Sequence, residues 1–180
     1  MEIKQSGGDV NWNVDKDKSG VKFKIRYLLT SISGSFKNYD ISVTTLGENF
    51  STAQIAFTAD LLTVDTNDPE RDSGIVNSDL LSNTSSHTME FTSGRLEKTS
   101  EHNFRAYGNM KLFDTTKTVI FDMNFIGLSR TPGDKVNACL TINGKIRYMD
   151  FIAKKDKPGI GSLFISDEAE IQVTVFADKP

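Results

Sequence analysis

The sequence predicts an all-β protein: an antiparallel up-and-down β-barrel, lipocalin-like in shape, of about eight strands with one short helix near residues 72–81. Two observations carry this expectation. Apolar residues alternate with polar ones along most of the chain, and most gaps between the alternating stretches are short. Alternation points successive side chains to opposite faces of a strand, so each strand is half buried. Short gaps favour antiparallel neighbours over helical crossovers.

Alternating stretches occur in order along the chain. Residues 21–29 place Val21, Phe23 and Ile25 on one face, with Lys22 and Lys24 on the other. The next stretches cover residues 39–43, 53–61, 104–112, 119–125, 136–142 and 169–175, with shorter candidates at 12–14 and 89–91. Residues 30–35 are rich in Ser and Gly and are interpreted as a break, as are the Pro-Gly turns at 131–134 and 157–159.

The segment 67–87 lacks alternation and is too long for a simple hairpin. Within it, residues 72–81 contain apolar pairs at 75–76 and 80–81, and Ser73 is available as a helix N-cap. We therefore expect a short helix that covers one end or flank of the sheet.

Two architectures bury a sheet that is apolar on one face, a sandwich or a barrel. Several stretches run for about nine or ten residues, which favours tilted barrel strands over sandwich strands. Closure into a barrel also removes exposed strand edges. A barrel with its apolar face inward is therefore the preferred architecture.

Composition bounds the class of protein. The chain has 180 residues, of which 37% are hydrophobic and 25% charged, with a formal net charge of −3. These values fit one globular domain, here residues 10–178 behind a flexible lead-in at 1–9, and exclude disordered classes. Mild acidity argues against a general nucleic-acid binder, and no apolar run is long enough to span a membrane. The single cysteine, Cys139, excludes an intrachain disulfide.

The inward stretches mix bulky and small residues, and they define the candidate ligand-binding residues. A barrel of about eight strands is either filled by its side chains or leaves room for one ligand, and both alternatives stay open. A cavity with almost no ionisable groups would accept an apolar, elongated guest. The predicted cavity lining comprises Phe23, Ile25, Tyr27, Ile41, Ile55, Phe57, Met110, Leu112, Phe121, Met123, Leu140 and Ile171.

Short motifs follow a specific order along nearly the whole chain, from Trp12 to Ala177. They include Trp-Asn-Val-Asp at 12–15, Ser-Gly-Val-Lys-Phe at 19–23, Gly-Ser-Phe at 34–36, Arg-Asp at 71–72 and Gly-Asn-Met-Lys-Leu at 108–112. This series resembles the YceI-like, polyisoprenoid-binding family. The resemblance implies a lipocalin-like barrel that binds a long isoprenoid, such as a polyprenyl phosphate or a quinone tail. It also implies a homodimer and a periplasmic or secreted location. Residues 1–8 lack the features of a signal peptide, which leaves a cytoplasmic location as the alternative.

Arg71 is the candidate for a polar head group because a guanidinium grips phosphate bidentately. The competing interpretation pairs Arg71 with Asp72 or Asp65 to stabilise the loop. We expect no metal site and no cofactor. Residues 15–20 match the first half of a calcium loop, but the bidentate Glu at its twelfth position is replaced by Arg26. The acidic residues between 65 and 72 are interpreted as a solvated loop.

No catalytic constellation emerges from the sequence, and Cys139 falls on the outward face of its strand. We therefore expect a non-enzymatic carrier or store of an isoprenoid-type lipid. One alternative is a non-catalytic interaction or structural module with a filled barrel and an exposed apolar patch around Ile120 and Phe176. A third hypothesis is a lipid-modifying enzyme, for which Tyr27 and His87 are weak candidates.

Overall fold

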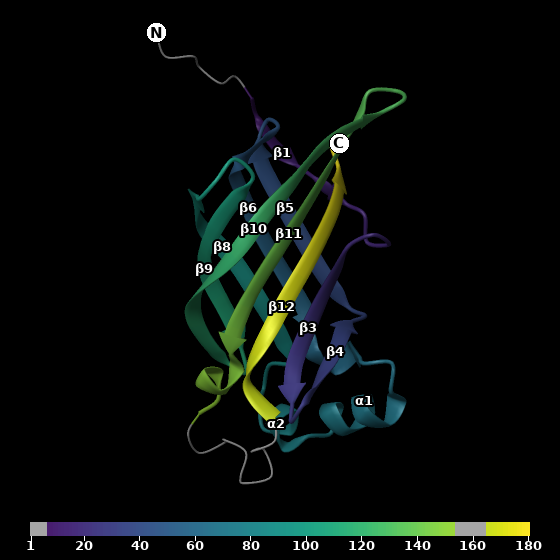
Figure 1. The fold of residues 1–180 in the computed structure, drawn as a ribbon, viewed down its shortest axis with the longest axis vertical. Coiled ribbons are helices and arrows are strands. Elements are labelled where there is room, and N and C mark those ends of the chain that lie inside the picture. Colours follow the sequence, from purple (N-terminus) through teal and green to yellow (C-terminus); the bar gives the residue numbers. More distant parts are fainter. Residues whose placement is uncertain (1–6, 154–164) are drawn as a thin grey trace.

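The computed structural model describes residues 7–153 and 165–180 and is nearly all β, as predicted (Figure 1). Within this part of the chain, every strand pairing is antiparallel. The long strands are β3 (Gly20–Tyr27), β4 (Thr30–Phe36), β5 (Tyr39–Leu46), β6 (Asn49–Asp60), β8 (Thr88–Lys98), β9 (Asn103–Leu112), β10 (Thr115–Thr131), β11 (Lys135–Arg147) and β12 (Ile165–Asp178).

The sheet follows the chain in up-and-down order and curls round on itself. Neighbours run from β5 through β6, β8, β9, β10, β11 and β12, and then return to β3 and β4. The ladder is interrupted between β4 and β5 in the described residues, so the structure is a half-open barrel. Two short strands extend the edges of this seam, since β1 (Asp9–Asn11) pairs with β5 and β7 (Val64–Asp65) with β4. A third, β2 (Asn13–Val14), pairs with the end of β12.

The expected break at residues 30–35 is wrong, because these residues form most of β4. Their small, polar side chains reflect an outer face of serines, while Gly34 lies on the inner face opposite Phe23. A Cβ on Gly34 would lie 2.7 Å from the Phe23 ring. The glycine is therefore part of the packing of β3 against β4 and does not mark a turn.

The expected helix is present, but it begins earlier and divides into α1 (Pro69–Val76) and α2 (Asp79–Ser82). Asp68 caps α1 in place of the expected Ser73, and its carboxylate accepts a 3.0 Å hydrogen bond from the Arg71 N–H. Pro69 at the first helical position favours this start, because its missing N–H needs no partner there. Both helices lie at the lower end of the barrel, together with the turn between β3 and β4 (Figure 1).

The core occupies the inside of the curled sheet and confirms the predicted alternation. Among the described residues, the buried polar or charged side chains are Thr45 and Thr66 alone. Two short 3-10 helices, Leu61–Thr63 and Tyr148–Phe151, add Leu61 and Phe151 to this core. The interior is therefore apolar along its described length.

Candidate functional site

The structure places eleven of the twelve predicted lining residues in or against the apolar core. Phe23 and Ile25 are partly buried. The fully buried members are Ile41, Ile55, Phe57, Met110, Leu112, Phe121, Met123, Leu140 and Ile171. Tyr27 differs, since its side chain is 38% exposed at the end of β3.

Burial falls steadily along the inner face of β3 toward the lower end of the barrel. Val21 is 0% exposed and Tyr27 38%, with Phe23 and Ile25 in between. Ile32 of β4 lies opposite Ile25 and is also partly exposed. We call Ile25, Tyr27 and Ile32 the apolar rim. It connects the buried interior to the surface by an unbroken series of apolar side chains.

Three phenylalanine rings meet inside the barrel. The Phe57 and Phe91 centroids are 5.2 Å apart, and those of Phe91 and Phe121 are 4.9 Å apart. Phe57 and Phe121 are separated by 6.1 Å. We call these residues the aromatic cluster. Rings at such spacings are in contact, so an apolar guest reaching this level has to displace them.

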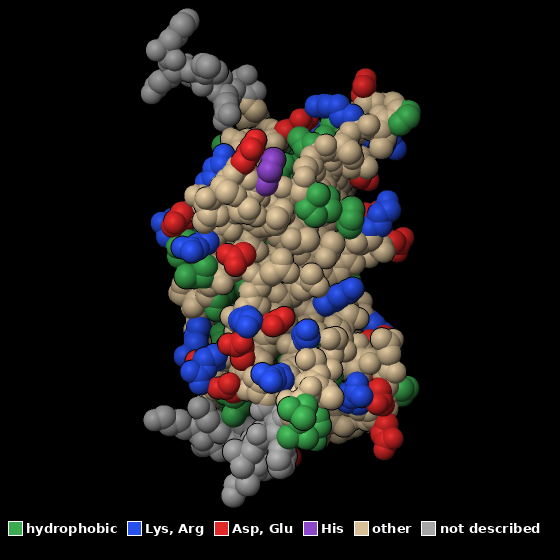
Figure 2. Space-filling view, viewed as in Figure 1, with side chains coloured by type: hydrophobic (Ala, Val, Ile, Leu, Met, Phe, Trp, Pro, Cys, Tyr) green, Lys and Arg blue, Asp and Glu red, His purple; other side chains and the backbone are tan. Residues whose placement is uncertain are grey.

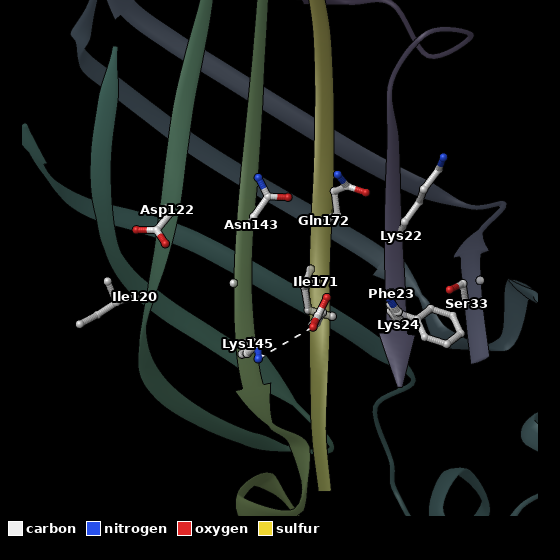
Figure 3. A pocket seen from close by; sticks show the side chains of 13 residues that line it. Lys22, Phe23, Lys24, Ser33, Ile120, Asp122, Asn143, Lys145, Ile171 and Gln172 are labelled. Carbon is white, nitrogen blue, oxygen red and sulfur yellow. Dashed lines mark ion pairs between the residues drawn. The ribbon is translucent and has the colours of Figure 1, made fainter. Parts of the chain in front are cut away.

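The outer face holds a groove of about 720 Å³ that sequence reasoning missed. It crosses β10, β11, β12, β3 and β4, and Figure 3 shows Asp122, Asn143 and Gln172 on three adjacent strands. Lys145 spans to Glu170 across it, with 3.9 Å between Nζ and the carboxylate. Outward alternation identified these residues as solvent-facing, but only the strand register shows that they share one groove.

Arg71 lies on α1 and pairs with Asp68, at 3.2 Å between the guanidinium and the carboxylate. Pairing with Asp72 or Asp65 is therefore wrong. The Asp72 carboxylate instead accepts hydrogen bonds from the backbone N–H and the hydroxyl of Thr66, at 2.9 and 2.6 Å. A hydrogen bond from the backbone N–H of Asn67 is the main reason that the pKa of Asp65 lies below its usual value, and the nearby Lys37 side chain lowers it further. Arg71 keeps 40% of its side chain exposed.

The candidate calcium loop is a tight turn between β2 and β3, in which the N–H of Ser19 donates to the Asp15 carbonyl at 2.9 Å. Lys18 lies 3.0 Å from the Asp15 carboxylate and lowers its pKa. The Tyr39 hydroxyl lies 2.7 and 2.8 Å from the carbonyl oxygens of Lys16 and Ser19, and its single hydrogen is shared between these two acceptors. Within residues 7–153 and 165–180, no group of three His, Cys, Asp or Glu side chains is placed to hold a metal ion.

Neither His87 nor Cys139 forms a nucleophilic site with its neighbours. His87 Nε2 lies 2.9 Å from the carbonyl oxygen of Leu81, at the end of α2. Cys139 faces outward, as predicted, between Gly127 of β10 and Phe176 of β12. Burial raises the pKa of its thiol, which keeps the thiol protonated and weakly nucleophilic.

None of the helices in the described part of the chain is long and apolar enough to cross a membrane.

The fold and its interior define a class of half-open antiparallel barrels with an apolar core that reaches the surface at one end. The chain belongs to the YceI-like domain family, which it matches over residues 12–177. Protein YceI of Shigella flexneri is 30% identical over 149 residues, which cover 81% of this chain and 78% of that protein.

Two solved structures share the fold. Burkholderia cenocepacia BcnA superimposes with a TM-score of 0.75 at 15% identity, covering 92% of this chain and 99% of BcnA. A polyisoprenoid-binding domain from Saccharophagus degradans superimposes with a TM-score of 0.64 at 14% identity, covering 94% of this chain and 98% of that domain. At these identities, the similarity shows the fold alone.

Proposed function

We propose that this protein binds a long isoprenoid-type lipid in the barrel interior, as a non-catalytic carrier or store. The observation that carries the proposal is the apolar inner face of β3, which runs unbroken from buried Val21 to the exposed Tyr27 of the apolar rim. An apolar tail sliding along this face exchanges water for hydrocarbon at every step, which contributes about 0.8 kcal/mol per methylene. Membership of the YceI-like family and the likeness to a polyisoprenoid-binding domain support this ligand class.

The apolar rim is the proposed entrance, and a polar head group would stay outside it. A polyprenyl phosphate and a quinone both fit this requirement, since each joins a long apolar tail to a polar end. Arg71 remains the proposed head-group contact, because 40% of its side chain is exposed on α1 at the same end of the barrel. Its pairing with Asp68 has to loosen when a phosphate binds.

Native mass spectrometry tests the proposal with the full chain and a polyprenyl phosphate supplied from detergent. We expect a one-to-one complex with wild type and loss of most of it in Ile25→Gln, which places an amide in the apolar rim. The matched control is Ile120→Gln, because Ile120 is 51% exposed on the outer face of β10. An unliganded mass for wild type, or equal uptake by both variants, overturns the proposal.

A second candidate function, a filled-barrel interaction module, has its own observation. The aromatic cluster places three rings in mutual contact inside the barrel. Ile126 and Phe176, 60% and 37% exposed, also mark an apolar outer surface near Cys139. This surface is the proposed homodimer seam, and light scattering on Phe176→Ser, which should shift the mass toward a monomer, tests it. Protein association without lipid uptake favours this second function.

We also propose a periplasmic or secreted location, in keeping with the family resemblance. Fractionation of the native host, with a periplasmic marker enzyme as the reference, tests this assignment. Recovery of the protein with the cytoplasmic fraction contradicts it.

A further inference from the structure

The turn between β3 and β4 presents three consecutive bulky apolar side chains to solvent. Tyr27 is 38% exposed, Leu28 55% and Leu29 95%. Leu28 has a φ of +52°, a left-handed conformation that glycine and asparagine adopt more readily than leucine. A tight turn therefore carries a large apolar side chain where a small or polar residue would be less strained. We call residues 27–29 the tip.

A row of basic side chains leads to the tip along the outer face of β3. Lys22, Lys24 and Arg26 are all exposed, and none forms an ion pair with a described residue. Each lies opposite a serine of β4, in the pairs Lys22–Ser35, Lys24–Ser33 and Arg26–Ser31. We call the three basic residues the basic row. Unpaired cations with neighbouring hydroxyls provide donors for phosphate oxygens.

We propose that the tip and the basic row dock the barrel onto the surface of an anionic phospholipid membrane. Exposed apolar side chains insert at the boundary between head groups and acyl chains, and adjacent cations are attracted to acidic lipids. The two features occur together at the lower end of the barrel, where Figure 2 shows an apolar patch beside Lys and Arg side chains. Acidic side chains border this surface: Glu170 of β12 lies opposite Lys24 in the strand register, and Glu70 and Asp79 lie on α1 and α2.

Docking in this orientation places the apolar rim at the membrane, because Tyr27 belongs to both the rim and the tip. A membrane lipid then reaches the interior without crossing water. The suggestion that docking delivers a lipid to the interior rests on the proposed function, but the test of docking itself does not. Vesicles free of isoprenoid lipid report docking alone, while uptake from detergent reports interior binding alone.

Co-sedimentation of the full chain with vesicles tests the proposal. We expect binding to vesicles of equal parts phosphatidylcholine and phosphatidylglycerol, weak binding to phosphatidylcholine alone, and loss of binding at high salt. The variant K22Q/K24Q/R26Q should bind on the order of 100-fold more weakly, at about fivefold per charge. The variant L28N/L29S should lose about 10-fold or more, and its asparagine suits the left-handed turn.

Matched controls remove the same kinds of side chain elsewhere. K98Q/R105Q/K135Q changes the net charge equally, at exposed positions outside the β3–β4 hairpin. L46S/L128S removes two leucines that are 46% and 38% exposed near the opposite end of the barrel. We expect both controls to bind like wild type. The proposal is overturned if wild type fails to bind anionic vesicles, which is the result expected if the tip contacts a protein partner instead. Equal binding to both vesicle types, or equal losses in the controls, also overturns it.

A reporter variant, Leu29→Trp, adds a readout of insertion. Trp12 is the one native tryptophan, and it is buried at 5% exposure, so a change in emission on adding vesicles reports the new side chain. A shift to shorter wavelength with anionic vesicles supports docking through the tip. Unchanged emission in a vesicle-bound sample shows that a different surface docks and overturns the proposal.

Discussion

The ring of Phe121 lies against the backbone of Gly144, where a side chain on β11 would otherwise stand. Gly144 pairs with Ile171 of β12, and its Cα therefore faces the interior between two apolar strands. Gly108 of β9 has the same relationship to the Phe91 ring, 2.7 Å from the position of an added Cβ. Two glycines on neighbouring sides of the barrel thus make room for the aromatic cluster.

Gly144→Ala should destabilise the protein by about 1–3 kcal/mol, because the added methyl forces the Phe121 ring out of its packed position. Urea denaturation measures the change. Gly20→Ala is the control, since nothing lies within 4 Å of the added Cβ at that position. The double variant G144A/F121L should recover part of the loss, and equal destabilisation with and without F121L contradicts this packing.

Thr45→Val should cost about 1–3 kcal/mol, because it leaves a buried donor without a partner. The Trp12 indole Nε1 donates to Thr45 Oγ1 at 2.8 Å, and that hydroxyl donates to the Gly47 carbonyl at 2.6 Å. Trp12 fluorescence follows unfolding directly. Thr92→Val is the matched control, as Thr92 is exposed on β8. Equal stability of the two variants would show that the hydrogen bond contributes nothing measurable.

The buried and exposed faces of most strands could be predicted from the sequence. Apolar and polar residues alternate within a single strand, so this pattern is visible without knowing which strands pair. Phe57 and Met123 are each 1% exposed, on the faces that alternation assigned. The start of α1 was also predictable, since Asp68 followed by Pro69 is a helix start signal that outranks Ser73.

β4 and the outer groove depend on contacts between distant residues. From the sequence alone, Gly34 suggests a turn. Only the pairing of β3 with β4 shows that it lies opposite Phe23 and belongs to a strand. Likewise, Asp122 and Gln172 share a groove only through the registers of β10 with β11 and of β11 with β12. The aromatic cluster has the same cause, because three rings from three strands meet only after the sheet curls.

Stability at acid pH should depend on Glu48, which joins three parts of the upper end. Its carboxylate lies 3.0 Å from Lys179 Nζ and 3.1 Å from the Arg130 guanidinium. The hydrogen bond from Lys179 is the main reason that the pKa of Glu48 is lowered. A lowered folded-state pKa contributes stability above the unfolded value of about 4.3, and this stability is lost as pH falls through the folded value.

Glu48→Gln should therefore be less stable than wild type at neutral pH by less than about 1 kcal/mol, with the difference shrinking below about pH 4. Urea midpoints between neutral and acid pH measure this effect. Glu101→Gln serves as the control, because Glu101 is exposed and forms no ion pair with the described residues. A difference between Glu48→Gln and wild type that grows toward acid pH contradicts the assignment.

The depth of the proposed lipid site should be limited by the aromatic cluster. Affinity should rise with tail length by about 0.8 kcal/mol per added methylene and then level off when the tail meets the rings. Phe57→Leu should move this plateau to longer tails, because a smaller side chain opens the interior beyond the cluster. Phe50→Leu is the control, since Phe50 stacks on Phe125 at 4.4 Å, toward the other end of β6. Native mass spectrometry with a series of prenyl alcohols gives both plateaus. If Phe50→Leu and Phe57→Leu shift the plateau alike, the rings do not set the depth, and a tail that enters by the rim stops elsewhere.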